Sequence, residues 1–123
     1  MQSHSAKPKA ELRHRCYYFS LHIIKFLDTL PDKRLFWVIA DQLLRSATSI
    51  GANVVEARGS SSKRDFARFF EIALKSANET KYWLALLRDS GKIDAKQTEK
   101  LLIEADEIAK MLGASIITLK GRR

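Results

Sequence analysis

The chain is poor in the residues that build cross-linked or turn-rich folds. Its 123 residues include one cysteine, two prolines and five glycines. A single cysteine excludes an internal disulfide framework and a zinc site built from cysteines, and it suits a reducing compartment, so we expect a cytoplasmic protein. So few glycines and prolines argue against a β-sandwich or barrel with many turns. Nowhere do about 18 apolar residues follow one another, so we predict no membrane span.

Motifs of catalysis and of metal binding are missing as well. The sequence contains no phosphate-binding loop, no dinucleotide fingerprint and no nucleophile elbow. It also lacks the Glu-x-x-His pairs that build carboxylate-bridged metal centres in helix bundles. All three histidines (His4, His14 and His22) lie in the first fifth of the chain. We therefore expect no enzymatic activity, no metal site and no cofactor.

What the sequence does contain is helical periodicity. Apolar residues recur at alternating spacings of four and three, the pattern of an amphipathic helix. The predicted helices cover about residues 9–29, 33–57, 63–89 and 95–119. Pro31 ends the first helix and Gly59 is expected to end the second in a left-handed conformation. Ser62 and Asp65 form a capping box at the start of the third.

Four helices with short connections predict an all-α, antiparallel up-down-up-down four-helix bundle. We expect one domain over residues 1–123, with basic arms at about 1–10 and 120–123. Gly51 lies inside the second helix and should weaken it by about 1 kcal/mol relative to alanine. That cost predicts a bend or a close approach of another helix at this position.

The excess positive charge lies at the two chain ends. The net charge is +8, of which residues 1–15 carry +3 and residues 118–123 carry +3. An up-down-up-down bundle brings both ends and the second connection together. The basic end should then hold Lys7, Lys9, Arg13, Arg15, Arg58, Lys63, Arg64, Arg68, Lys120, Arg122 and Arg123. Such a cluster favours a polyanion, nucleic acid first; a soluble protein with charged, frayed ends is the alternative.

Apolar residues exceed what one inward stripe requires. The surplus on the second predicted helix alone comprises Leu35, Trp37, Val38, Ile39 and Leu44. Large exposed apolar patches usually mark association surfaces, so the surplus predicts self-association. A broader core within a monomer is the alternative.

Polar residues gather on one side of the second predicted helix. Ser46, Ser49, Asn53 and Glu56 are spaced three, four and three, so they should share a face. We expect a hydrogen-bonded polar seam, with Asn53 and Glu56 buried and with Arg45 or Arg68 as the charged partner. Glu79 on the third helix could also meet this seam.

One segment resembles a known family signature. Residues 42–57 read QLLRSATSIGANVVEA, which resembles the signature of the four-helix bundle proteins encoded in 23S rRNA intervening sequences. That signature has an arginine, small residues, Ser-Ile-Pro-Ala-Asn and a glutamate. The segment from Ser62 to Glu79 fits the second block of the family, and the match covers about residues 16–119. Gly51 stands where the family usually has proline.

The resemblance implies a bundle that assembles as a ring-shaped homopentamer, has no enzymatic activity and is suspected of binding RNA. The family is similar in fold to the accessory variability determinant of diversity-generating retroelements, a partner of a reverse transcriptase. The recurring polar positions of the family are Arg45, Asn53, Glu56, Arg68 and Glu79 in this sequence.

These observations predict a non-enzymatic homo-oligomer, a pentamer by resemblance, that binds structured nucleic acid and RNA in particular. Sequence specificity should be low, because no stacking-platform motif and no base-reading module is present. The alternative is a protein-binding scaffold, such as an accessory subunit of a retroelement reverse transcriptase. A structural oligomer without a nucleic-acid role is a third interpretation.

Overall fold

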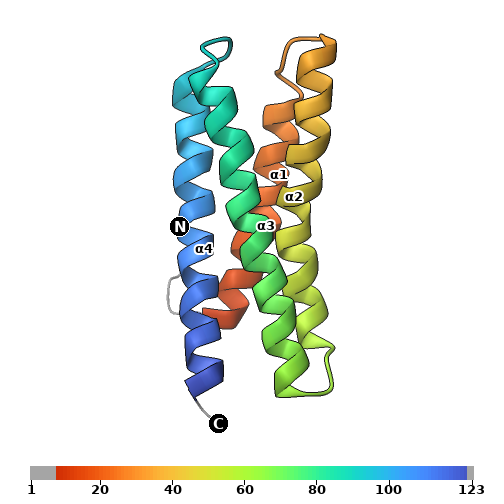
Figure 1. Ribbon diagram of the computed structural model, residues 1–123, viewed down its shortest axis with the longest axis vertical. Coiled ribbons are helices and arrows are strands. Elements are labelled where there is room, and N and C mark those ends of the chain that lie inside the picture. Colours follow the sequence, from red (N-terminus) through yellow and green to blue (C-terminus); the bar gives the residue numbers. More distant parts are fainter. Residues whose placement is uncertain (1–7, 122–123) are drawn as a thin grey trace.

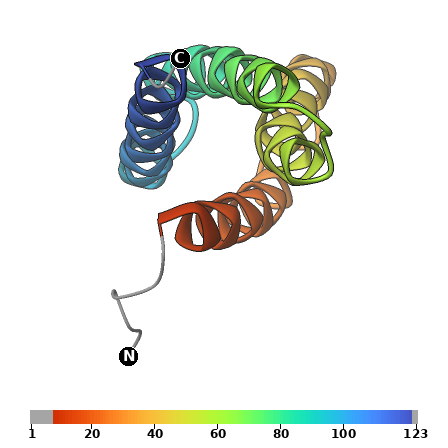
Figure 2. The ribbon, with the colours of Figure 1, turned by 90° about the horizontal axis from the view of Figure 1, so that it is seen from below.

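The computed structural model describes residues 8–121, which form four α-helices. These are α1 (Pro8–Leu27), α2 (Arg34–Arg58), α3 (Lys63–Asp89) and α4 (Ala95–Gly121). Consecutive helices run antiparallel and follow one another around the bundle (Figures 1 and 2). The predicted up-down-up-down bundle is confirmed, and the helix bounds agree with the prediction to within two residues. None of the described helices has the length and apolar character needed to cross a membrane.

Local signals set the helix ends, with one difference from expectation. The Ser62 hydroxyl accepts a hydrogen bond from the Asp65 backbone N–H at 3.0 Å, as the capping box predicts. Gly59, however, has a φ of −92°, so the expected left-handed conformation is wrong. The backbone N–H of Gly59 and the hydroxyl of Ser60 bond instead to the carbonyls of Glu56 and Ala57. Those bonds satisfy the last carbonyls of α2 without a left-handed residue.

The core lies between the inward faces of all four helices. Phe19, Leu43, Phe70 and Leu112 are fully or almost fully buried, as their spacing predicts. On α4 the four-three spacing predicts Leu102 as an inward residue, and this is wrong in part, because Leu101 is buried and Leu102 is only half-buried. The smallest core residues are alanines, which let neighbouring helices approach closely. They are Ala47, Ala57, Ala73, Ala77, Ala105 and Ala109.

Gly51 lies at a close contact between α1 and α2. A Cβ added at Gly51 would lie 3.2 Å from the Cβ of Cys16, which is 1% exposed. The predicted reason for this glycine, a close helix approach, is therefore present. Burial raises the pKa of Cys16 to about 12, and the charge of Arg15 lowers it only in part. At neutral pH Cys16 is a protonated, buried thiol that acts as a small apolar residue.

Two glycine substitutions separate helix propensity from helix contact. Gly113 lies inside α4 with no heavy atom within 4 Å of an added Cβ. We expect Gly113→Ala to raise the free energy of unfolding by about 1 kcal/mol, the propensity difference between the two residues. Gly51→Ala should gain nothing or lose stability, because α1 must shift away from the new methyl group. Denaturant titration of both variants tests this, and equal stabilisation would contradict the close contact.

Candidate nucleic-acid interface

The fold brings the predicted basic residues to one end of the bundle. The start of α1, the α2–α3 connection and the end of α4 all lie at the lower end in Figure 1. We define the basic end by its described side chains: Arg13, Arg15, Arg58, Lys63, Arg64, Arg68 and Lys120. Lys7, Arg122 and Arg123 lie outside the described residues, and of Lys9 only the helical backbone is described.

Two members of the basic end are engaged by acidic side chains. Arg15 Nη2 lies 2.6 Å from Glu107 Oε1, which ties α1 to α4. Lys120 Nζ lies 2.6 Å from Glu71 Oε2, which ties α4 to α3. These ion pairs partly neutralise both cations and reduce what they can offer to a ligand. The sequence prediction counted Arg15 and Lys120 among the nucleic-acid-binding residues, because residue spacing does not reveal ion-pair partners on other helices.

The cations around the α2–α3 connection are free of such partners. Arg58, Lys63 and Arg64 are exposed and form no ion pair with any residue in the described range 8–121. Arg68 is also exposed, and its guanidinium lies 5.8 Å from the centre of the Phe69 ring. This distance is typical of a cation–π contact, which leaves the charge in place. The strongest uncompensated positive charge of the basic end therefore surrounds this connection.

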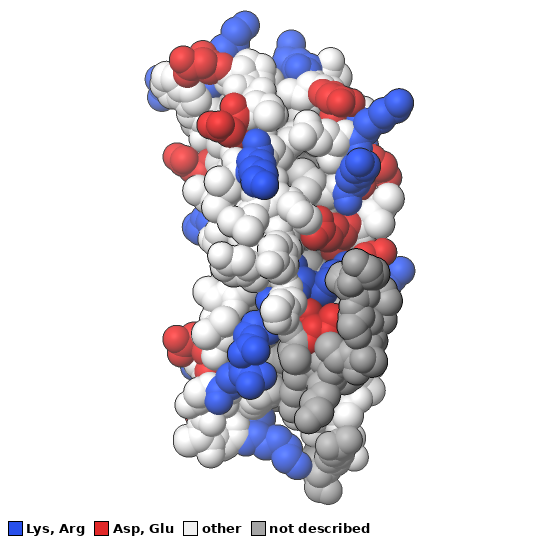
Figure 3. Space-filling model, turned by 180° about the vertical axis from the view of Figure 1, so that it is seen from behind, with Lys and Arg blue, Asp and Glu red and all other residues white. Residues whose placement is uncertain are grey.

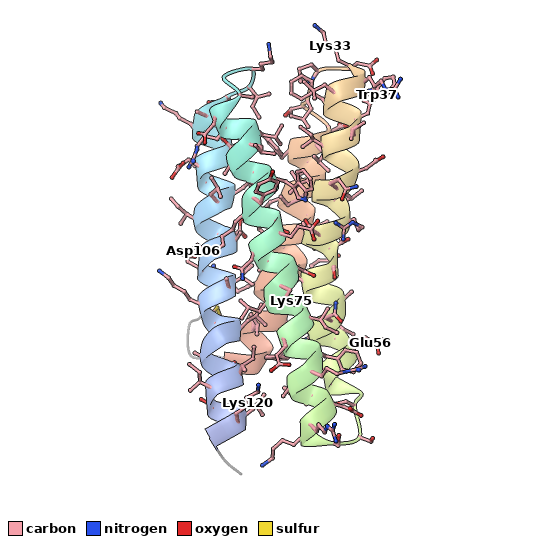
Figure 4. All side chains as sticks on the ribbon, in the orientation of Figure 1. Lys33, Trp37, Glu56, Lys75, Asp106 and Lys120 are labelled. Atoms are coloured by element: carbon pink, nitrogen blue, oxygen red, sulfur yellow. The ribbon has the colours of Figure 1, made fainter. Side chains whose placement is uncertain are left out.

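A groove runs between the start of α3 and the end of α4. It has a volume of about 520 Å³, and Ala67, Glu71 and Leu119 form part of its lining. Its basic lining residues are Lys63, Arg64, Arg68 and Lys120. Figure 4 shows Lys120 on the lower part of α4, beside α3. A groove with an apolar wall and several cations can accept a phosphate group and a neighbouring apolar surface.

The opposite end of the bundle carries charges of both signs. Arg88 forms ion pairs with Asp89 at 2.9 Å and with Glu99 at 3.1 Å. The hydrogen bond from Arg88 lowers the pKa of Asp89. Trp37 donates its indole N–H to Asp32 at 2.8 Å. Figure 3 shows red and blue side chains intermixed over the upper part of the rear face, so positive charge does not accumulate there.

A polar seam connects α2 and α3, but its residues differ from the prediction. The hydroxyls of Ser46 and Thr80 lie 2.9 Å apart, and both side chains are fully buried. One turn away, the hydroxyls of Ser49 and Ser76 also lie 2.9 Å apart. Ser76 and Thr80 are four residues apart on α3, so their spacing alone predicts that the two hydroxyls share one face of that helix. Small hydroxyls satisfy one another here without charge.

The predicted charged core of this seam is wrong. Glu56 is exposed and points away from the bundle (Figure 4). Asn53 is half-buried, and its amide donates to Ser49 rather than to an arginine. Arg45 does form an ion pair with Glu79, at the surface of the described chain. The prediction was wrong about the direction of Glu56 around the axis of α2. The ten residues from Ser46 to Glu56 turn by about 1,000°, about 80° short of three full turns, so Glu56 does not lie directly in line with the buried Ser46.

The buried hydroxyl pair makes a measurable contribution to stability. Thr80→Val should lower the free energy of unfolding by about 1 kcal/mol, because Ser46 loses one hydrogen-bond partner inside the core. Ser46→Ala should cost a similar amount, and the double variant should cost less than the sum of the two. A double-mutant cycle from urea titrations measures this coupling. Additive effects would show that the two hydroxyls act independently.

Comparison with known proteins places the chain in a family. No match was found among functionally curated proteins. A crystal structure at 1.70 Å of a protein of unknown function from the S23 ribosomal protein family of Bacteroides thetaiotaomicron is similar, with 36% identity and a TM-score of 0.84. The match covers 89% of this chain and 98% of that chain. The family described as 23S rRNA-intervening sequence protein matches residues 9–114. The chain therefore belongs to the family of 23S rRNA-intervening sequence proteins.

Proposed function

We propose that this protein is a non-enzymatic homopentamer that binds structured RNA through its basic end, with low sequence specificity. The observation that carries the proposal is the group of exposed, unpaired cations at Arg58, Lys63 and Arg64. Cations without acidic partners are free to bind phosphates, and phosphate contacts supply most sequence-independent affinity. The family description, which refers to 23S rRNA, favours RNA among the possible polyanions.

Low specificity follows from the kind of groups that the basic end presents. Arginine and lysine at the ends of helices reach the nucleic-acid backbone, and phosphate contacts fix position without reading bases. Arginine can also contact phosphate with two parallel hydrogen bonds, which favours ordered, structured backbones. A ring would repeat the same basic end on each subunit, so that weak contacts add up to avidity.

Exposed apolar residues support self-association. Trp37 is 57% exposed and Leu35 is 55% exposed in the single chain. Others of this kind are Ile24, Val38, Leu44, Ile72, Leu86, Ile103 and Ile117. Such residues occur on all four helices, which fits a ring in which each subunit contacts two neighbours through different faces. Of the surplus residues named on the second predicted helix, Leu35, Trp37, Val38 and Leu44 are exposed, whereas Ile39 is half-buried against the core.

Sedimentation equilibrium tests the subunit number. We expect a mass of about five times the 14.0 kDa of one chain at micromolar concentration, because burial of these apolar faces stabilises the ring. The mass should persist at high salt, since apolar contacts are not screened. A stable monomer under these conditions would contradict the pentamer.

Salt-dependent binding tests the basic end. We expect a variant with Arg58, Lys63 and Arg64 replaced by glutamine to bind structured RNA more weakly. Its log–log salt slope should also be smaller, by roughly 0.9 for each phosphate that the variant no longer neutralises, if the RNA duplex behaves as B-DNA does. Fluorescence titration of labelled RNA at two salt concentrations gives both quantities.

A matched control removes the same charge from the other end. Lys33, Arg34 and Lys92 are exposed there, and their replacement by glutamine should leave affinity almost unchanged. Equal loss in both variants would mean that only net charge matters. If the basic-end variant binds RNA as tightly as the wild type, the scaffold function takes precedence, with the exposed apolar faces contacting a protein such as a reverse transcriptase.

A further inference from the structure

A second groove lies beside the basic end, between the outer sides of α1 and α2. Its volume is about 620 Å³. The lining residues from α1 are Arg13, His14, Tyr17, Tyr18 and Ser20, and those from α2 are Thr48, Gly51, Ala52 and Val55. Neither the core nor the ion pairs between the helices use the aromatic members of this set. We name it the tyrosine groove.

The groove is lined by some residues with short side chains and others with large ones. Ser20, Thr48, Gly51 and Ala52 have short side chains, so the space between the two helices stays open. Tyr17 is 63% exposed and Tyr18 is 52% exposed. The short side chains of both helices therefore leave the space between the larger lining residues unfilled.

The aromatic rings form one contiguous cluster. The Tyr17 and Tyr18 rings meet edge to face, with centroids 5.3 Å apart. The Tyr18 ring is nearly parallel to that of His14, with centroids 6.5 Å apart.

Positive charge lies next to these rings. Arg13 precedes Tyr17 by four residues on α1, so both lie on the same side of the helix, and Arg13 has no ion pair within the described chain. On α2, Val55 lies one turn before Arg58, which belongs to the basic end. Figure 3 shows Lys and Arg side chains over the lower part of the rear face.

We propose that the tyrosine groove binds an unpaired nucleobase of RNA, with the base stacked on Tyr17 and an adjacent phosphate on Arg13. This inference rests on the proposed RNA-binding function and refines its substrate class. Every base offers a π-face to an aromatic ring, so stacking requires no particular sequence. A base inside a duplex is already stacked, whereas a base in a loop or a single strand is available. The favoured ligand is therefore a structured RNA with an unpaired loop.

Substitutions of tyrosine test the stacking role without changing charge. We expect Tyr17→Ala to bind single-stranded oligouridylate about tenfold more weakly, and a duplex of equal phosphate number as tightly as the wild type. Tyr17→Phe retains the ring and should stay within about twofold of the wild type. Tyr82→Ala removes an equally exposed tyrosine from α3, outside the groove, and should have no effect. Circular dichroism verifies that each variant is folded.

The salt slope separates the base from the phosphate. Tyr17→Ala should keep the wild-type slope for the single strand, because it removes no charge. Arg13→Gln should lower that slope by about 0.7, the value for one phosphate contact on a single strand. Fluorescence anisotropy of the labelled oligonucleotide at two salt concentrations measures affinity and slope together.

Two results would overturn this assignment. One is that Tyr17→Ala binds the single strand as tightly as the wild type does. The other is that Tyr17→Ala changes the mass in sedimentation equilibrium, because the occupant of the groove is then a second copy of this chain. Failure of RNA binding itself is a different result, since the wild-type protein would then bind neither the single strand nor the duplex.

Discussion

The packing of α3 between α2 and α4 is the contact on which the rest of the bundle depends. α3 runs alongside both neighbours for much of its length, and its inner face is built on the buried Ala73 and Ala77. Small residues at this position allow the helix axes to approach, and apolar burial then supplies the main stabilisation. Because α2, α3 and α4 are held antiparallel, the α2–α3 connection and the end of α4 must lie at one end of the molecule. The accumulation of cations there follows from this packing.

α1 completes the bundle through a smaller and more specialised set of contacts. It approaches α2 closely at Gly51 and Cys16, and it meets α4 through the ion pair of Arg15 with Glu107 and through a polar contact between His22 Nδ1 and Glu104. Surface ion pairs of this kind contribute little to stability, typically below about 1 kcal/mol. The burial of the Phe19 and Ile23 side chains is therefore the main interaction that keeps α1 in place. Gly51 also lines the tyrosine groove on the outer side of the two helices.

The proposed function depends on how charged and aromatic side chains are distributed over the described helices. Within residues 8–121, cations that lack acidic partners surround the α2–α3 connection, whereas Arg15 and Lys120 are paired with acids on neighbouring helices. Under the proposed function, the cations without acidic partners are the ones that contact phosphate. The tyrosine groove adds an apolar, aromatic element beside this charge, and the two together suit a polyanion that also exposes bases.

The sequence by itself determined the four helices, their antiparallel order and the gathering of basic residues at one end. These features depend on periodicity and connection length, which are local properties of the chain. Only the tertiary structure decided that Glu56 is exposed, that Ser46 pairs with Thr80, and that Arg15 and Lys120 are engaged by Glu107 and Glu71. Residue spacing places a side chain on a broad helix face, but contacts across helices depend on rotation and axial register, which packing of the whole core sets.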